Sequence, residues 1–265
     1  MHAFNYHRPS SLADASGLAG KGADAKLLAG GQSLVQAMKL RLSAPSDLVD
    51  LNQIAELRGI KSDGKTVTVG AMARHAEVAA SAEVKKAIPA LAALAELIGD
   101  RQVRNQGTIG GSLANNDPAA DYPAAVLGLG ATVVTNKRKI AADEFFKGMF
   151  ETALQAGEII TQVSFPVPKR AGYVKFKNPA SRFAIVGVFV ADTGSGVRVA
   201  VTGAGPSVFR QSEMEKSLSA KFAPESVASV KVKADGLNGD LHASAEYRAH
   251  LVGVMAKRAV EAALK

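Results

Sequence analysis

The chain has 265 residues, and its 32 Lys and Arg against 24 Asp and Glu give a formal charge of +8 at pH 7. Hydrophobic residues make up 47% and charged residues 21%, which is ordinary for a globular protein and excludes a disordered, collagen-like or coiled-coil chain. The sequence has no cysteine, so disulfides, cysteine-ligated zinc and cysteine-held iron–sulfur clusters are excluded within it.

The first predicted unit is a strand, a glycine turn, a helix and a second strand. Apolar residues predict a strand over 26–29, which a pair of glycines ends. Apolar positions four residues apart predict a helix over 33–42, and residues 47–51 predict the second strand.

Later segments alternate between helical and extended patterns. The patterns predict a hairpin over 58–70, helices over 73–80 and 89–99, a polar glycine-rich loop over 104–118, a helix from Asp117 to Gly128 and a strand over 131–135. They then predict strands over 159–167, 173–177, 183–191 and 197–201, a hairpin turn over 192–196, further helix beyond 205 and a last helix over 244–265. Prolines, a basic pair and a glycine predict a domain boundary within 165–172.

Two Gly-Gly segments, Gly30-Gly31 and Gly110-Gly111, are the candidate sites for an anionic ligand. Glycine lets backbone amides approach a bulky anion, and a helix N-terminus favours a phosphate group. The alternative for the first segment is a plain tight turn with Ser33 as helix cap. The alternative for the second is a solvated loop with Asp117 as a cap.

Other chemistries have weak support. The five histidines form no close-spaced ligand set, and no nucleophile elbow, dinucleotide fingerprint or P-loop string is present. The positive charge is compatible with nucleic acid, but no motif of interleaved aromatic and basic residues supports that class. No apolar run reaches the ~18–20 residues of a membrane helix, and no signal peptide is visible. We therefore expect a cytoplasmic protein.

Several strings in the sequence, in order along nearly the whole chain, resemble the FAD-binding medium subunit of the carbon monoxide dehydrogenase and xanthine dehydrogenase type of molybdenum hydroxylases. They are Asn5 to Pro9, Ala29 to Leu34, Thr108 to Asn115, Asp117 to Asp121 and Glu246 to Arg248. The resemblance implies an α+β fold with a PCMH-type FAD-binding domain over 1–168, divided into subdomains of about 1–55 and 56–168. A C-terminal domain with a small antiparallel sheet and helices would follow over 169–265.

The resemblance also implies the cofactor-binding residues. Both glycine loops would hold the FAD diphosphate with backbone amides, and Asp121 would contact the flavin's polyol region. Ile160, Lys177 and Phe183 would lie near the flavin ring. The complete set is Ala29, Gly30, Gly31, Gln32, Ser33, Leu34, Thr108, Ile109, Gly110, Gly111, Ser112, Asn115, Asp121, Ile160, Lys177 and Phe183.

By resemblance, the chain is an oxidoreductase subunit that is inactive on substrate alone. It would take electrons from iron–sulfur clusters of a small subunit and pass them through FAD to an external acceptor. A large subunit would hold the molybdenum cofactor and the substrate, and the assembly would be a dimer of heterotrimers. Gln32 stands where some relatives carry His, so FAD is expected to be non-covalent. The alternatives are a flavin-free scaffold subunit and a basic nucleic-acid-binding protein.

Overall fold

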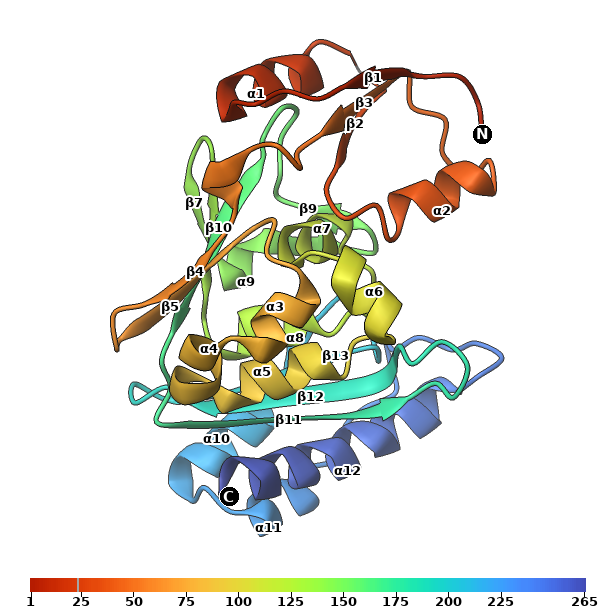
Figure 1. Cartoon of the computed structure of the whole chain (residues 1–265). Coiled ribbons are helices and arrows are strands. Elements are labelled where there is room, and N and C mark those ends of the chain that lie inside the picture. Colours follow the sequence, from red (N-terminus) through yellow and green to blue (C-terminus); the bar gives the residue numbers. More distant parts are fainter. Residues whose placement is uncertain (23) are drawn as a thin grey trace.

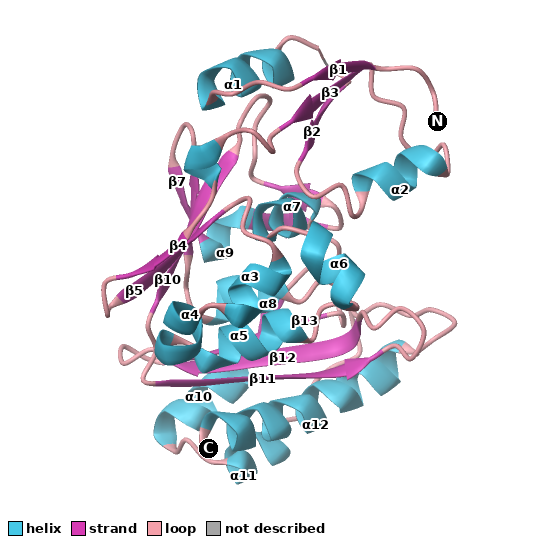
Figure 2. Cartoon of the chain, in the orientation of Figure 1, coloured by secondary structure: helices cyan, strands magenta, loops and turns pink. Residues whose placement is uncertain are grey.

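The computed structural model describes residues 1–22 and 24–265. The chain forms three stacked parts, and the N-terminal part lies farthest from the C-terminal helix (Figure 1). Helices and strands are mixed in all three parts (Figure 2), as the α+β expectation requires.

The N-terminal part is the predicted strand–turn–helix–strand unit with one more strand and helix. Its parallel sheet has the order β1–β3–β2. The elements are β1 (Asn5–His7), α1 (Leu12–Gly20), β2 (Ala25–Leu28), α2 (Leu34–Lys39) and β3 (Asp47–Asp50). Helix α2 is shorter than predicted because Arg41 adopts a left-handed φ of 61°, and the amide of Leu42 then returns to the carbonyl of Ala37.

The middle part is an antiparallel sheet of order β4–β5–β10–β6–β7 with helices beside it. Its strands are β4 (Ile60–Ser62), β5 (Thr66–Gly70), β6 (Thr132–Thr135), β7 (Lys139–Ala141) and β10 (Ile160–Pro166). Its helices are η1 (Ala55–Leu57), α3 (His75–Ala80), α4 (Ala82–Ala87), α5 (Pro89–Glu96), α6 (Arg101–Gln106), α7 (Ile109–Asn115), α8 (Tyr122–Gly128) and α9 (Ala142–Phe145). A two-stranded ribbon of β8 (Phe146–Gly148) and β9 (Glu151–Thr152) completes it.

The C-terminal part is an antiparallel sheet of order β11–β12–β13–β14, packed between two sets of helices. Its elements are β11 (Arg170–Lys177), β12 (Ala184–Asp192), β13 (Val197–Thr202), β14 (Phe209–Arg210), α10 (Ser212–Ala220), α11 (Pro224–Ala228) and α12 (Ala245–Ala263). Helix α12 packs on β11 and β12, and α5 and α8 of the middle part also contact this sheet (Figure 1).

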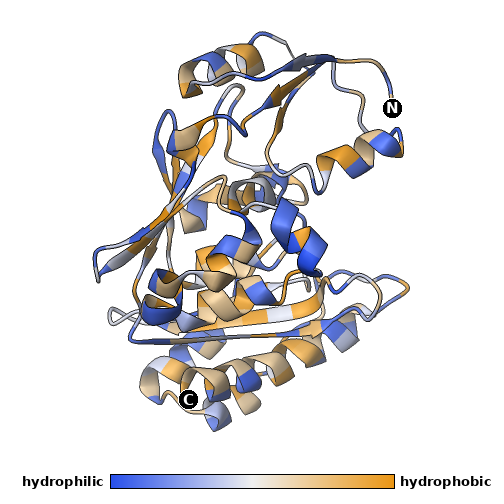
Figure 3. Ribbon diagram, in the orientation of Figure 1, coloured by the Kyte–Doolittle hydropathy of each residue, from blue (hydrophilic) through white to orange (hydrophobic). Residues whose placement is uncertain are grey.

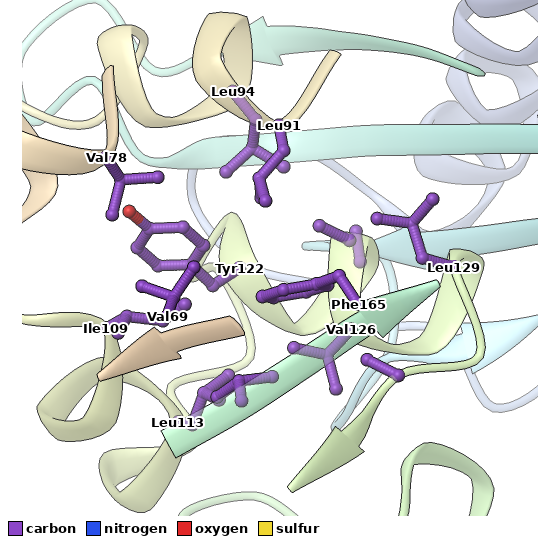
Figure 4. Close-up of a cluster of buried hydrophobic side chains, with 14 of the residues drawn as sticks. Val69, Val78, Leu91, Leu94, Ile109, Leu113, Tyr122, Val126, Leu129 and Phe165 are labelled. Atoms are coloured by element: carbon purple, nitrogen blue, oxygen red, sulfur yellow. The ribbon is translucent and has the colours of Figure 1, made fainter. Parts of the chain in front are cut away.

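The largest apolar core joins the middle and C-terminal parts. Tyr122 and Phe165 lie in it together with Phe189 of β12, and Figure 4 shows the first two among Val69, Leu91 and other aliphatic side chains. A second core lies between the C-terminal sheet and α10 to α12, and a third joins the N-terminal part to the middle part through Leu57, Met72 and Ile159. The C-terminal sheet is therefore buried on both faces, and β12 is mainly hydrophobic along its length (Figure 3).

Two predictions about the segment from 104 to 128 are wrong. The predicted loop over 104–118 contains the second half of α6 and all of α7, because Asp100 and Thr108 cap these helices by accepting from the amides of Val103 and Gly111. Asp117 does not cap a helix. Its carboxylate accepts from the amide of Ala119 in a turn, and the helix begins later, at Tyr122.

The helices in the described part of the chain are all too short or too polar to cross a lipid bilayer.

Candidate functional site

The first glycine segment presents a row of free amides at the start of a helix. Among the described residues, no acceptor is found for the backbone amides over 30–34, and the next amide, of Val35, donates to Gly31 O at 3.1 Å. Gly31 has a φ of 73°, which turns the chain from β2 into α2. Successive outward amides at a helix N-terminus form an anion-binding concavity. The segment is therefore a candidate site for an anionic group such as a diphosphate.

The first segment packs directly on the end of α6. A Cβ at Gly30 would lie 1.9 Å from the carbonyl oxygen of Gln106, so no other residue fits there without a backbone shift. On the other side, the Asn52 amide group donates to Ala29 O at 3.1 Å and to the buried carboxylate of Asp50 at 2.7 Å. The free amides are thus fixed in place by β3 and α6.

The second glycine segment was expected to bind the diphosphate with its backbone amides, but these amides already have acceptors within the chain. All four amides over 109–112 donate within the chain, to Ala73 O, Ala71 O and the hydroxyl and carbonyl oxygens of Thr108, at 2.8–3.2 Å. Gly110 is required because a Cβ there would lie 2.7 Å from the Cβ of Ala71. The second segment therefore offers a close backbone surface and the half-buried side chains of α7, and its amides are already bonded.

The two glycine segments lie side by side. A Cβ placed on Gly111 would be 3.5 Å from the Cβ of Ala29. Ile160 is connected to the second segment through Ala71. The carbonyl of Ala71 accepts from the amide of Gly110 at 2.8 Å, and the amide of Ala71 donates to the carbonyl of Thr161, the residue after Ile160, at 2.9 Å. The structure brings together the predicted residues of both segments and Ile160.

Asp121 lies in a separate, buried cluster at the junction of the middle and C-terminal parts. Its carboxylate accepts a hydrogen bond of 2.5 Å from the Tyr173 hydroxyl and one of 3.0 Å from the Lys175 ammonium. The side chains of Asp121 and Lys175 are 4% and 2% exposed. Burial raises the pKa of Asp121, and the ammonium and the hydroxyl oppose this rise by favouring the charged form.

Lys177 and Phe183 lie at the ends of β11 and β12, around the hairpin that joins these strands. Both are exposed, Phe183 to 46%. In this hairpin the Arg182 guanidinium donates to Gly99 O, next to the start of α6. Helix α6 has six residues, about 9 Å, and its far end touches the first glycine segment. The largely hydrophilic α6 (Figure 3) therefore extends from the first glycine segment toward the hairpin between Lys177 and Phe183.

A buried imidazole connects the second segment to the Asp121 cluster. A Cβ at Gly107 would lie 2.4 Å from His75 Nε2, and the His75 ring centre is 5.3 Å from that of Tyr122. Burial, with a smaller contribution from Arg104, lowers the pKa of His75 to about 4. The neutral ring is a packing element behind the site.

Sequence reasoning missed four residues that hold the site, namely Asp50, Asn52, Tyr173 and Lys175. Asp50 and Asn52 had a usable signal, because polar residues at the carboxyl end of a parallel strand line the ligand edge of such sheets. Tyr173 and Lys175 alternate with apolar residues in an ordinary strand pattern, and only the fold shows that they face Asp121. Within the described residues, no group of three His, Asp or Glu side chains could hold a metal ion.

Comparison with known proteins gives full-length matches. Residues 2–168 match the family described as the FAD binding domain in molybdopterin dehydrogenase, and residues 171–263 match the CO dehydrogenase flavoprotein C-terminal domain. The chain is 38% identical to the carbon monoxide dehydrogenase medium chain of Hydrogenophaga pseudoflava, covering 98% of this chain and 96% of that one. It is 37% identical to the nicotine 6-hydroxylase medium subunit of Paenarthrobacter nicotinovorans, covering 98% and 97%.

A solved structure has the same fold over nearly the full length of the chain. A structure of carbon monoxide dehydrogenase from Hydrogenophaga pseudoflava, which lacks the Mo-pyranopterin moiety of the molybdenum cofactor, superposes with a TM-score of 0.90 at 38% identity. The superposition covers 98% of this chain and 97% of that one.

Proposed function

The chain belongs to the family of FAD-binding flavoprotein subunits of molybdopterin dehydrogenases, and on this premise we propose that it carries electrons through FAD within a three-subunit molybdenum hydroxylase. The observation that supports the proposal most directly is the row of free amides over 30–34 at the start of α2. Family membership favours this function over a flavin-free scaffold or a nucleic-acid-binding protein.

We assign FAD to the sixteen residues named from the sequence. The amides over 30–34 bind the diphosphate, and the adjoining face of α7 closes the cradle from the other side. Asp121 serves the polyol, and Lys177 and Phe183, at the far end of α6, flank the flavin ring. Gln32 offers no nucleophile for a covalent link, so the cofactor is dissociable. Held by these residues, FAD would supply the ability to accept electrons singly and to release them in pairs.

The partners of the chain are the subunits that hold the other redox centres of the enzyme. The chain has no cysteine to hold iron–sulfur clusters, so a small subunit supplies them and a large subunit supplies the molybdenum cofactor and the substrate site. We place the assembly, a dimer of such heterotrimers, in the cytoplasm, with an external acceptor receiving the electrons. We place the domain boundary at 168, between β10 and β11.

Reconstitution of the purified chain with FAD tests the proposal. About one FAD per chain is expected, and acid precipitation should release the yellow colour into the supernatant. A chain that stays colourless contradicts the site, and colour that stays in the pellet contradicts dissociable binding.

A second measurement locates the cradle. Gly31→Val should abolish FAD binding while the circular dichroism spectrum is retained, because a branched Cβ at a positive φ displaces the amides. An unchanged FAD affinity would show that the segment is only a turn.

A further inference from the structure

The least expected group beside the proposed site is a buried lysine. The Lys175 side chain is 2% exposed and its ammonium lies 3.0 Å from Asp121 Oδ2. A buried charge is costly unless it is paired and hydrogen-bonded. Because Asp121 Oδ1 also accepts from the Tyr173 hydroxyl, each carboxylate oxygen is held by one donor from β11.

The geometry points to Tyr173 and Lys175 as positioning residues that hold the Asp121 carboxylate for the polyol of FAD, an inference that rests on the proposed function. Asp121 is the first residue before α8, yet its side chain makes no capping bond to that helix. Its carboxylate turns instead toward β11, where Tyr173 and Lys175 lie two residues apart and so on the same face.

The arrangement leaves the carboxylate able to serve a ligand. Two carboxylate oxygens offer about four acceptor positions, and Tyr173 and Lys175 take one on each oxygen. The remaining acceptor positions would serve the polyol through the 4% of the Asp121 side chain that stays exposed.

The packing around Tyr173 fixes its hydroxyl in turn. In the β11–β12 ladder, Gly187 lies opposite Lys175, and a Cβ on Gly187 would lie 2.5 Å from the Tyr173 hydroxyl oxygen. A glycine at this position therefore leaves the space that the hydroxyl occupies. The Tyr173 ring also packs at 6.1 Å from the ring of Phe189.

Tyr173→Phe tests the inference in the full chain, since it removes one oxygen and keeps the ring. We expect FAD affinity, measured by flavin fluorescence titration, to fall about fivefold, the effect of one hydrogen bond. Affinity for ADP should not change, because ADP carries the diphosphate but lacks the polyol and the flavin ring. General damage to the fold would instead lower the affinity for both FAD and ADP.

Tyr122→Phe is the matched control. The Tyr122 hydroxyl is also buried, next to Asp121 in sequence, but has no hydrogen-bond partner among the described residues and lies close to Val78 (Figure 4). This variant should bind FAD like the parent chain. An equal loss of FAD affinity in both variants would overturn the inference.

A double-mutant cycle with Asp121→Asn completes the test. If Tyr173 acts through Asp121, Tyr173→Phe should have almost no further effect on FAD affinity in the Asp121→Asn background. Additive losses, or a Tyr173→Phe chain that binds FAD like the parent, would overturn the inference. A parent chain that binds ADP and FAD equally would also overturn it, and a parent chain that binds neither would contradict the proposed function itself.

Discussion

Gly30 is the residue at which the first glycine segment depends most on the absence of a side chain. Gly30→Ala would place a Cβ 1.9 Å from the Gln106 carbonyl oxygen, which belongs to the backbone and cannot rotate away. The segment must then shift from α6, so we expect a loss of about 1–3 kcal/mol in stability and a clear loss of FAD affinity. Chemical denaturation and FAD titration measure the two effects.

Gly17 provides the control for this prediction. It lies inside α1, and among the described residues, apart from its chain neighbours and the backbone of this helix, no atom lies within 4 Å of the Cβ that Gly17→Ala would add. This variant should be neutral or more stable by about 0.5–1 kcal/mol. Equal losses in Gly30→Ala and Gly17→Ala would contradict the close packing at Gly30.

His75 gives the chain a defined pH dependence. Its pKa is lowered from 6.5 to about 4 in the folded chain, so the unfolded chain binds more protons between these values. The contribution of neutral His75 to the free energy of unfolding should therefore be fully present above pH 6.5. It should be lost as the pH decreases toward 4, by about 3 kcal/mol at most. Urea unfolding at pH 7 and pH 5 should show a smaller difference in His75→Phe than in the parent. The exposed His250→Phe should behave like the parent, and equal pH slopes in all three chains would contradict the assignment.

At the scale of elements, periodic segments and glycine turns were predictable, and the glycine-containing helix α7 was not. The strand–turn–helix–strand order of β2, α2 and β3, the turn between β12 and β13, and the cap of α12 at Ser244 all follow from local patterns. Helix α7 has no such pattern, because Gly110 packs against Ala71 and Gly111 lies against Thr108 and Ala29. Contacts between distant segments stabilise this helix, and single-sequence propensity does not contain them.

Asn116 ends α7 and holds the β8–β9 ribbon. It has a left-handed φ of 43°, and its amide group donates to Gly148 O and Glu151 O at 2.7 and 2.8 Å. Asn116→Ala should destabilise the chain by about 2–4 kcal/mol, because it loses two hydrogen bonds and strains the backbone. Asn116→Gly should be less harmful by about 1 kcal/mol, since glycine accepts this φ. Thermal unfolding of both variants measures the difference, and an Ala variant as stable as the Gly variant would contradict the role of the backbone.

At the scale of the molecule, the candidate site is assembled from all three parts of the fold. The first glycine segment comes from the N-terminal part, the second from the middle part, and Tyr173 and Lys175 from the C-terminal sheet. The last two lie more than fifty residues from Asp121 in the sequence. The resemblance to the family assigned the glycine segments to FAD, whereas the pairing of Asp121 with Tyr173 and Lys175 across the parts required the fold.

The positive charge of the whole chain bears on its assembly. A net charge of +8 favours association with more acidic partner surfaces, and such association is faster at low salt. The chain alone should show at most weak reduction of artificial dyes, because substrate chemistry needs the centres of the other subunits. Co-expression with the large and small subunits, followed by size exclusion, should give one complex containing all three. A flavin chain that elutes alone, and that oxidises a physiological substrate by itself, would contradict the electron-transfer function.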